Sequence, residues 1–208
     1  MGLLFNANFL FYLAGYLIGA IPFGYLLGRF VGKVNIRETG SGSIGATNVL
    51  RVLKEKNPVL AKNLSILTVF CDALKGAIVM IVALLAGFDE NVAWTIAVLA
   101  VIGHCFSPYL LFEGGKGIAT GVGVVMVMLP AEACLGLLAW FIAAKAIKIS
   151  SIASLVGMLT AVLLSFVIHP EVPGINTHAP IVIIGFIIFY KHIPNIVRLL
   201  RREEAKVV

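Results

Sequence analysis

Apolar residues occur along the chain in long blocks, separated by short polar turns and by one long polar segment. A helix needs about 20 apolar residues to cross the hydrocarbon core of a bilayer. Most of the blocks reach or approach this length, so the pattern predicts an all-α integral membrane protein. Seven transmembrane helices are expected, at residues 9–30, 64–87, 92–112, 118–129, 131–147, 151–168 and 179–190.

Two of these segments differ from a plain apolar helix. The first contains Pro22, which predicts a kink. It also carries four glycines at spacings that allow close helix packing: Gly15, Gly19, Gly24 and Gly28. The fourth has about 12 apolar residues, or about 18 Å of helix against a hydrocarbon core of about 30 Å. We interpret it as a short or tilted span, with a re-entrant segment as the alternative.

The composition excludes a soluble globule, because 60% of the residues are hydrophobic, 12% are charged and the mean hydropathy is +1.03. The net charge of +6 is therefore interpreted as a topology signal at an anionic membrane face. No aromatic-plus-basic pattern indicates a nucleic-acid partner. Cys71, Cys105 and Cys134 lie in apolar stretches without CxxC spacing, so we expect buried thiols and neither a disulfide framework nor a zinc site.

The positions of lysine and arginine predict the orientation of the chain. All 16 of these residues except Lys75 lie at Arg29, in the alternate loops 32–63, 113–117 and 145–150, or in the C-terminal tail. Seven spans place these segments on one side, with the N-terminus outside and the C-terminus cytoplasmic. Beyond Lys191, apolar and basic residues occupy opposite helical faces, which predicts a short separate helix on the membrane surface. We treat residues 1–208 as a single polytopic membrane domain.

The long polar segment contains the sequence GSGSIGATNVLR at residues 40–51. Glycines allow backbone N–H groups to turn toward a ligand, hydroxyls add donors, and an arginine offers a planar fork that suits phosphate. The motif therefore predicts an anion-binding loop, and a simple polar connector is the alternative. The candidate binding residues here are Gly40, Ser41, Gly42, Ser43, Gly45, Thr47, Asn48 and Arg51.

A second glycine-rich turn, EGGKG at residues 113–117, precedes the short fourth segment. Free N–H groups and the positive end of the helix dipole favour a phosphate at such a helix start. The Walker pattern is not matched, because Gly117 follows Lys116 where a serine or threonine is required. We predict a phosphate or acyl-phosphate cradle made by Gly114, Gly115, Lys116 and Gly117, and a topology lysine beside a flexible turn is the alternative.

Charged residues also occur inside the second span. Asp72 and Lys75 are three residues apart, a helical spacing that lets them pair. They form either a structural ion pair or a support for the site, for example by orienting Arg51. We expect His104, within the third span, to support the glycine turn.

Two further polar clusters fall on the cytoplasmic side of the predicted topology. Ser151 and Ser154 follow a basic turn, and His192 and Asn195 in HIPN end the last predicted span. His192 is either a substrate contact or a cap at a helix C-terminus. The chain has no HxxxxD, GxSxG or HExxH motif and no Cys/His metal set, so no metal or other cofactor is expected.

The motifs together resemble those of the bacterial acyl-phosphate:glycerol-3-phosphate acyltransferases of the PlsY type. GSGSIGATN with Arg51, GHCFSPYLLFEGGKGIATG, SSIAS, and HIPN followed by IVRLL carry the resemblance over essentially the whole chain. Glu113 stands where members usually have lysine, the proline after GHxF comes one place later, and Ile193-Pro194 replaces a usual Arg-Glu pair.

The resemblance implies a seven-helix enzyme of the bacterial inner membrane. Such an enzyme transfers an acyl group from acyl phosphate to position 1 of glycerol 3-phosphate, giving lysophosphatidic acid. The donor is made by a soluble phosphate acyltransferase, a potential partner. Residues matching the family's functional positions are Ser41, Arg51, Lys116, Ser154, His192 and Asn195.

Because an acyl phosphate is already activated, positioning and charge neutralisation supply most of the rate without an acyl-enzyme. Either the donor's own phosphate or His192 is the base for the glycerol hydroxyl.

Two other classes of membrane protein fit the two glycine-rich loops less well. A transporter of a phosphorylated metabolite requires polar residues at mid-membrane, and a structural membrane protein does not require both glycine motifs on one side.

Overall fold

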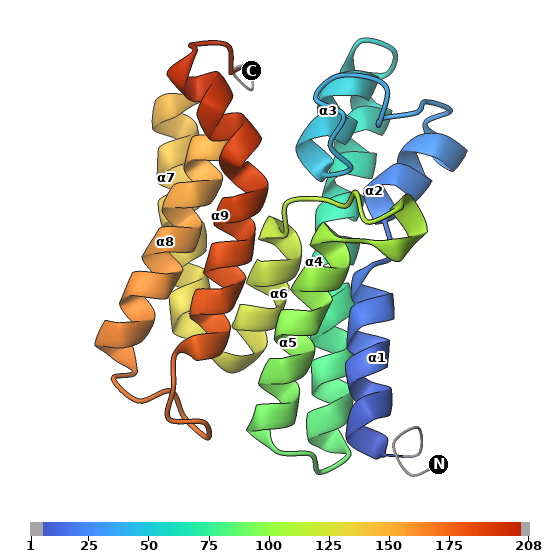
Figure 1. Cartoon of the computed structure of the whole chain (residues 1–208). Helices are drawn as coiled ribbons and strands as arrows, with labels where there is room; N and C mark the ends of the chain where they lie inside the picture. Colours follow the sequence, from blue (N-terminus) through green and yellow to red (C-terminus); the bar gives the residue numbers. More distant parts are fainter. Residues whose placement is uncertain (1–5, 205–208) are drawn as a thin grey trace.

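The computed structural model describes residues 6–204, and these form helices and connecting turns without a strand (Figure 1). The elements in chain order are α1 (Ala7–Gly19), α2 (Phe23–Leu26), the π-helical turn η1 (Leu27–Val31), α3 (Ala46–Lys54), α4 (Pro58–Leu85), α5 (Glu90–Cys105), the 3₁₀ turn η2 (Pro108–Leu110), α6 (Ile118–Met128), α7 (Pro130–Ile147), α8 (Ser150–Ile168) and α9 (Ala179–Leu200).

Six stretches of the described chain are long and apolar enough to cross a membrane. They are Ala7–Val31, Pro58–Leu85, Glu90–Leu110, Pro130–Ile147, Ser150–Ile168 and Ala179–Leu200. The remaining predicted span, the fourth, corresponds to α6, whose 11 residues are too few for a straight crossing. The prediction of an all-α, multi-pass membrane protein is thus confirmed, with one short helix among six long ones.

The helices form two groups that α6 connects (Figure 1). On one side α1 and α4 pack against α5, and α3 covers the end of α4. On the other side α7, α8 and α9 pack together. The α5 helix is enclosed by α1, α4, α6 and α9, and its buried side chains, including Trp94 and Ile96, belong to the main apolar core.

The first and last predicted spans compare differently with the structure. The chain breaks between α1 and α2 around Pro22, which confirms the predicted irregularity. The prediction of a separate surface helix after Lys191 is wrong, because α9 continues without interruption to Leu200. Its residues His192 and Asn195 are 1% and 3% exposed, so packing extends past the expected end and offsets the hydrogen bond that Pro194 removes.

Cysteine burial is also only partly as expected. Cys105 is buried, whereas Cys134 is exposed and Cys71 is partly exposed, and all three are free thiols. Periodicity alone does not distinguish the lipid-facing side of a span from its packed side, since both are apolar.

Glycines allow helix backbones to touch at several crossings. A Cβ on Gly19 would lie 2.5 Å from the Cα of Ala100 on α5. A Cβ on Gly24 would lie 2.0 Å from the carbonyl oxygen of Ile44 in the polar segment. The predicted packing role of the glycines in the first span is therefore confirmed at these positions.

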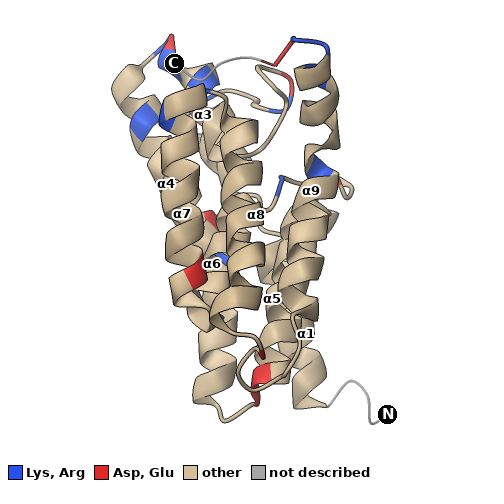
Figure 2. Ribbon diagram, turned by 90° about the vertical axis from the view of Figure 1, so that its left-hand side faces the viewer, with Lys and Arg blue, Asp and Glu red and all other residues tan. Residues whose placement is uncertain are grey.

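Basic residues gather at one end of the molecule. Figure 2 shows most lysines and arginines at the end where the C-terminus lies, and the N-terminus at the opposite end. This separation of charge is the one that the loop sequences predict.

We expect Gly123→Ala to destabilise the protein, because its Cβ would lie 1.9 Å from the carbonyl oxygen of Ala73 on α4. Overpacking of this kind costs about 1–3 kcal/mol. Gly121→Ala on the same helix is the matched control, since its Cβ would meet only the side-chain ends of Ile188 and Ile184, at 3.0 and 3.6 Å. Thermal unfolding in detergent should give a lower Tm for Gly123→Ala than for Gly121→Ala. Equal Tm values would contradict the close packing of α4 and α6.

Candidate active site

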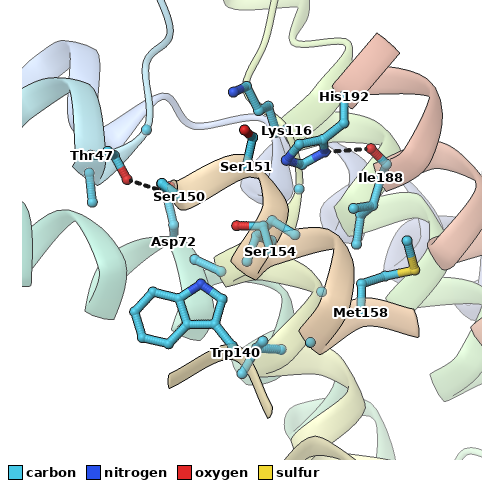
Figure 3. Close-up of a pocket in the computed structure, with 18 of the residues that line it drawn as sticks. Thr47, Asp72, Lys116, Trp140, Ser150, Ser151, Ser154, Met158, Ile188 and His192 are labelled. Carbon is cyan, nitrogen blue, oxygen red and sulfur yellow. Dashed lines mark hydrogen bonds between the residues drawn. The ribbon is translucent and has the colours of Figure 1, made fainter. Parts of the chain in front are cut away.

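The polar motifs of the sequence come together around one cavity of about 670 Å³ (Figure 3). The lining residues with polar side chains, and the lining glycines of the two loops, lie at one end of it. They include Gly40, Ser41, Ser43, Gly45, Thr47, Asn48, Arg51, Asp72, His104, Lys116, Gly117, Ser150, Ser151, Ser154, His192, Asn195, Arg198 and Glu204. Four predicted site residues, Gly42, Lys75, Gly114 and Gly115, do not line it. Motifs from Gly40 near the start of the chain to Asn195 near its end thus line one cavity.

The cavity changes from polar to apolar along its length. On α8 the lining residues run from Ser151 and Ser154 to Met158 and Val162, following one helical face. The α9 helix shows the same change in the opposite chain direction, from Asn195 and His192 to Ile184 and Ile181. Such a cavity suits a ligand with an anionic head and an apolar chain.

Asn48 determines the shape of the first glycine-rich loop. Its Nδ2 group donates to the carbonyl oxygens of Ile36 at 2.8 Å, Ser43 at 2.9 Å and Thr39 at 3.2 Å. Its Oδ1 accepts a hydrogen bond from the N–H of Ser41 at 2.8 Å. Because these bonds use the whole amide, Asn48 holds the loop in place rather than offering a free donor to a ligand.

The loop requires glycine where it passes Asn48. Gly40 has φ +65°, and a Cβ there would lie 2.3 Å from Asn48 Oδ1. Gly42 also has positive φ, at +68°. Both positions therefore favour glycine for backbone reasons, and the path they set brings Ser41 and Ser43 to the cavity.

Three helices begin at the cavity wall without a side-chain cap. The N-cap residues are Gly45 for α3, Gly117 for α6 and Ile149 for α8, and none of them provides a side chain that accepts a hydrogen bond from the first turn. The first turns therefore have free N–H groups and the positive ends of three helix dipoles. A hydroxyl contact of 3.3 Å between Thr47 and Ser150 joins the starts of α3 and α8 (Figure 3). This arrangement favours the binding of anions.

The second glycine-rich turn is held against the end of α5. The N–H of Gly115 donates to the carbonyl oxygen of His104 at 2.9 Å, and the N–H of Gly114 donates to that of Cys105 at 3.2 Å. A Cβ on Gly115 would lie 2.1 Å from His104 Nε2, so only glycine fits over this ring. The turn places Lys116 in the cavity lining.

Lys75 supports this turn from inside the helix bundle. Its Nζ donates to Asp72 Oδ1 and to the carbonyl oxygen of Ile21, both at 3.0 Å, and lies 2.7 Å from His104 Nδ1. An ammonium group is only a donor, so Nδ1 accepts and the ring proton lies on Nε2, beneath Gly115. The expected Asp72–Lys75 pair is present. Lys75 is the ion-pair partner of Asp72 among residues 6–204, and no hydrogen bond or ion pair there joins Asp72 to Arg51.

Lys116 and Arg51 supply positive charge at the polar end. Burial lowers the pKa of Lys116 to about 8, against the opposing effect of Glu204, and Arg198 and Arg51 lower it further. Neither Lys116 nor Arg51 forms a side-chain hydrogen bond or ion pair with another residue in the described part of the chain. Both cations are available to an anionic ligand.

His192 presents a free ring nitrogen to the cavity. Its Nδ1 donates to the carbonyl oxygen of Ile188 at 2.8 Å, which leaves an unprotonated Nε2. In Figure 3 this second nitrogen points away from Ile188, toward Ser151. A fixed imidazole of this kind can accept a hydrogen bond from a substrate hydroxyl.

Arg198 and Glu204 line the cavity but were not among the sequence-based candidates. Glu204 accepts hydrogen bonds from Ser151 Oγ at 2.8 Å, Asn195 Nδ2 at 2.6 Å and Arg198 Nε at 2.7 Å. Burial alone raises the pKa of Glu204, but these three bonds lower it overall. The spacing of Arg198, three residues after Asn195, places both on one face of α9. For Glu204, no sequence pattern indicates a position in the cavity.

Glu113, which departs from the family pattern, lies outside the cavity. Its carboxylate pairs with Arg37 at 2.8 Å and is 79% exposed. The pair links the two polar segments at the surface, and contributes little stability.

Comparison with known proteins identifies the family to which the chain belongs. Residues 9–202 match the family described as glycerol-3-phosphate acyltransferase. The glycerol-3-phosphate acyltransferase of Wolinella succinogenes is 59% identical over 208 residues, covering all of both chains. That of Campylobacter lari is 60% identical over 201 residues, covering 97% of this chain and 99% of the relative.

The fold is similar to that of solved enzymes. A crystal structure of PlsY, an integral membrane glycerol 3-phosphate acyltransferase, in its glycerol 3-phosphate form, superposes with a TM-score of 0.86 at 31% identity, covering 98% of this chain and 96% of that one. The lysophosphatidic acid form gives a TM-score of 0.83 at the same identity, covering 97% and 95%. The chain therefore belongs to the PlsY family of integral membrane glycerol-3-phosphate acyltransferases.

Proposed function

We propose that the protein transfers a fatty acyl group from acyl phosphate to the 1-hydroxyl of glycerol 3-phosphate, giving lysophosphatidic acid and phosphate. The observation that carries the proposal is the single cavity with a cationic end and an apolar end. Both substrates have an anionic group, and the donor also has a long apolar chain. The two can meet only where both kinds of surface adjoin.

In this reaction the glycerol oxygen attacks the acyl carbon of the donor. A carbon–oxygen ester bond forms, the carbon–oxygen bond to phosphate breaks, and inorganic phosphate leaves. Because the donor is a mixed anhydride, no acyl-enzyme is needed, and positioning and charge stabilisation supply the rate.

Two cations and three helix starts hold the two phosphates in this proposal. Arg51, Lys116 and the N–H groups at the starts of α3, α6 and α8 neutralise charge, while Ser41 and Ser154 add hydroxyl contacts. The acyl chain lies in the apolar part of the cavity, between α6, α7, α8 and α9.

The donor phosphate is the base that we propose for the glycerol hydroxyl, since a phosphate titrates at about pH 6 and lies beside the reacting atoms. His192 Nε2 accepts the hydrogen bond that orients this hydroxyl. General base catalysis by His192 itself is the competing mechanism, because the same lone pair is available for the proton.

Orientation in the membrane follows from charge. We place the basic end, with the cavity and the C-terminus, on the cytoplasmic side of the bacterial inner membrane, and the N-terminus outside, with α6 as a short seventh crossing. Residues 1–208 then act as one membrane domain. The donor comes from a soluble phosphate acyltransferase that meets the same face.

The donor prediction is tested with purified protein in detergent, given glycerol 3-phosphate and either palmitoyl phosphate or palmitoyl-CoA. We expect lysophosphatidic acid from palmitoyl phosphate and none from palmitoyl-CoA. Product from palmitoyl-CoA alone would refute the proposed donor. Tight binding of glycerol 3-phosphate with no product from either donor would favour a transporter of a phosphorylated metabolite.

The role of His192 is tested by two substitutions. His192→Ala removes the orienting hydrogen bond and should lower kcat at least about tenfold, with little change in KM. His192→Gln keeps a hydrogen-bond acceptor but cannot take up the proton, so it should recover most of the lost kcat if the donor phosphate is the base. A His192→Gln enzyme as inactive as His192→Ala, with losses of about 10²–10⁴-fold, would assign the base to His192.

Lys116 should make substrate capture sensitive to alkaline pH. Its pKa of about 8 means that the ammonium form is present below this pH and is lost above it. Hence kcat/KM for glycerol 3-phosphate should fall as pH rises through about 8, since this parameter reports the free enzyme. Lys116→Arg keeps its charge and should move the decline to higher pH. An unchanged profile in Lys116→Arg would show that another group causes the decline.

A further inference from the structure

The apolar part of the cavity ends toward the end of the bundle opposite the C-terminus (Figure 1). The lining residues farthest from the basic end are Val125 on α6, Ala133 on α7, Val162 on α8 and Ile181 on α9, and we call these four residues the end wall. Val125, Ala133 and Ile181 are 6%, 3% and 2% exposed. Most of the end wall is therefore closed to the surroundings.

Polar residues lie one helical turn beyond the end wall. Ser165 follows Val162 by three residues, and His178 precedes Ile181 by three residues. Residues three apart on a helix share one face, so each polar residue continues the face that lines the cavity. Ser165 is 0% exposed, which places this layer inside the bundle.

Hydrogen bonds in this polar layer join three helices to one another. The Nε2 group of His178 donates to the carbonyl oxygens of His169 at 2.9 Å and Ser165 at 3.1 Å. A second hydrogen bond joins His169 Nδ1 to the carboxyl group of Glu132, which directly precedes Ala133 on α7 and is 0% exposed. The layer thus connects the start of α9, the end of α8 and the start of α7.

The polar layer is a barrier to an acyl chain. A buried carboxyl group within a membrane-spanning segment is unfavourable, so Glu132 needs a partner such as His169. An acyl chain that passed the end wall would separate these groups and leave them buried without partners. This separation costs more than the burial of one further methylene group gains. The chain is therefore expected to stop above the layer.

The depth of the cavity matches one acyl chain of a membrane lipid. His192 and Ile181 line the cavity eleven residues apart on α9, which corresponds to about 16 Å along the helix. The hydrocarbon core of a bilayer is about 30 Å thick and holds two layers of acyl chains, so one chain extends over about half of this thickness. The end wall thus lies at the level expected for the last carbons of the chain.

Ala133 has the smallest side chain of the end wall. It carries a single methyl group, whereas the other three residues are branched. A larger side chain at this position would therefore take up space at the end of the cavity. The hydrogen bond from His169 holds the adjacent Glu132, so the start of α7 has little freedom to move away.

We propose that Ala133 determines the longest acyl chain that the enzyme accepts from its donor, and that the Glu132–His169 hydrogen bond positions Ala133 at the end of the cavity. The inference rests on the proposed function and adds to it a specificity-determining residue and a positioning pair. Its consequence is that the accepted chain length changes when the size of residue 133 or the hydrogen bond is changed.

The first test compares Ala133→Leu with wild type and with Ala131→Leu, the same change at an exposed residue of α7 outside the cavity lining. We measure kcat/KM in detergent with lauroyl, myristoyl, palmitoyl and stearoyl phosphate at saturating glycerol 3-phosphate. In Ala133→Leu the ratio of palmitoyl to lauroyl phosphate should fall at least about tenfold, because the leucine fills the space of several methylene groups. Ala131→Leu should keep the wild-type ratio. An unchanged ratio in Ala133→Leu, or an equal loss with every donor, would overturn the proposal.

The positioning pair is tested by two substitutions of Glu132. Glu132→Leu removes the hydrogen bond to His169, and the ratio of stearoyl to palmitoyl phosphate should rise about threefold or more as the end of the cavity loosens. Glu132→Gln keeps a hydrogen-bonding group for His169 and should restore the wild-type ratio. A lower Tm with a wild-type ratio in Glu132→Leu would show that the pair only stabilises the fold, and would refute its positioning role.

A binding measurement separates this proposal from the proposed function. Each acyl phosphate is added without glycerol 3-phosphate, and the rise in Tm reports its binding. Suppose that wild type turns over no donor, yet palmitoyl phosphate stabilises wild type and Ala131→Leu but not Ala133→Leu, while lauroyl phosphate stabilises all three. The chain-length proposal then stands and the function is wrong. If wild type produces lysophosphatidic acid with the same chain-length ratio as every variant, the function stands and the chain-length proposal is wrong.

Discussion

A single buried ammonium group, that of Lys75, ties together the elements on which the site is built. Its Nζ contacts Asp72 on its own helix, the Ile21 carbonyl oxygen at the break after α1, and His104 on α5. An uncompensated charge inside a protein is strongly unfavourable, and loss of one partner of a buried pair costs about 3–5 kcal/mol. The three contacts therefore fix the relative positions of α1, α4 and α5, and through His104 they fix the turn that carries Lys116.

The cavity combines two requirements that usually conflict. Anions need donors and positive charge, whereas an acyl chain needs an apolar wall. The structure separates them along single helices, so that α8 and α9 each contribute polar side chains at the basic end and apolar ones farther in. Backbone N–H groups at three helix starts add favourable potential for an anion at the polar end without burying further charged side chains.

The C-terminal segment completes the polar end with a group of the wrong sign. Glu204 brings a carboxylate among Lys116, Arg51 and Arg198, where four charged groups influence one another. Without an anion these cations would repel each other inside a partly buried site. The carboxylate of Glu204 offsets part of this repulsion.

The sequence by itself determined the membrane class, the long helices, the side on which the polar motifs gather and, through GSGSIGATN and GGKG, the family. These features follow from local composition, helical periodicity and loop charge, which need no knowledge of packing. Only the tertiary structure decided that Asn48 shapes its loop, that α9 continues past Pro194, that His104 links Lys75 to the glycine turn, and that Glu204 enters the cavity. Most of these features depend on contacts between segments far apart in the chain, as does the contact of Thr47 with Ser150. Such contacts leave no local sequence pattern, because the packing of the helices creates them.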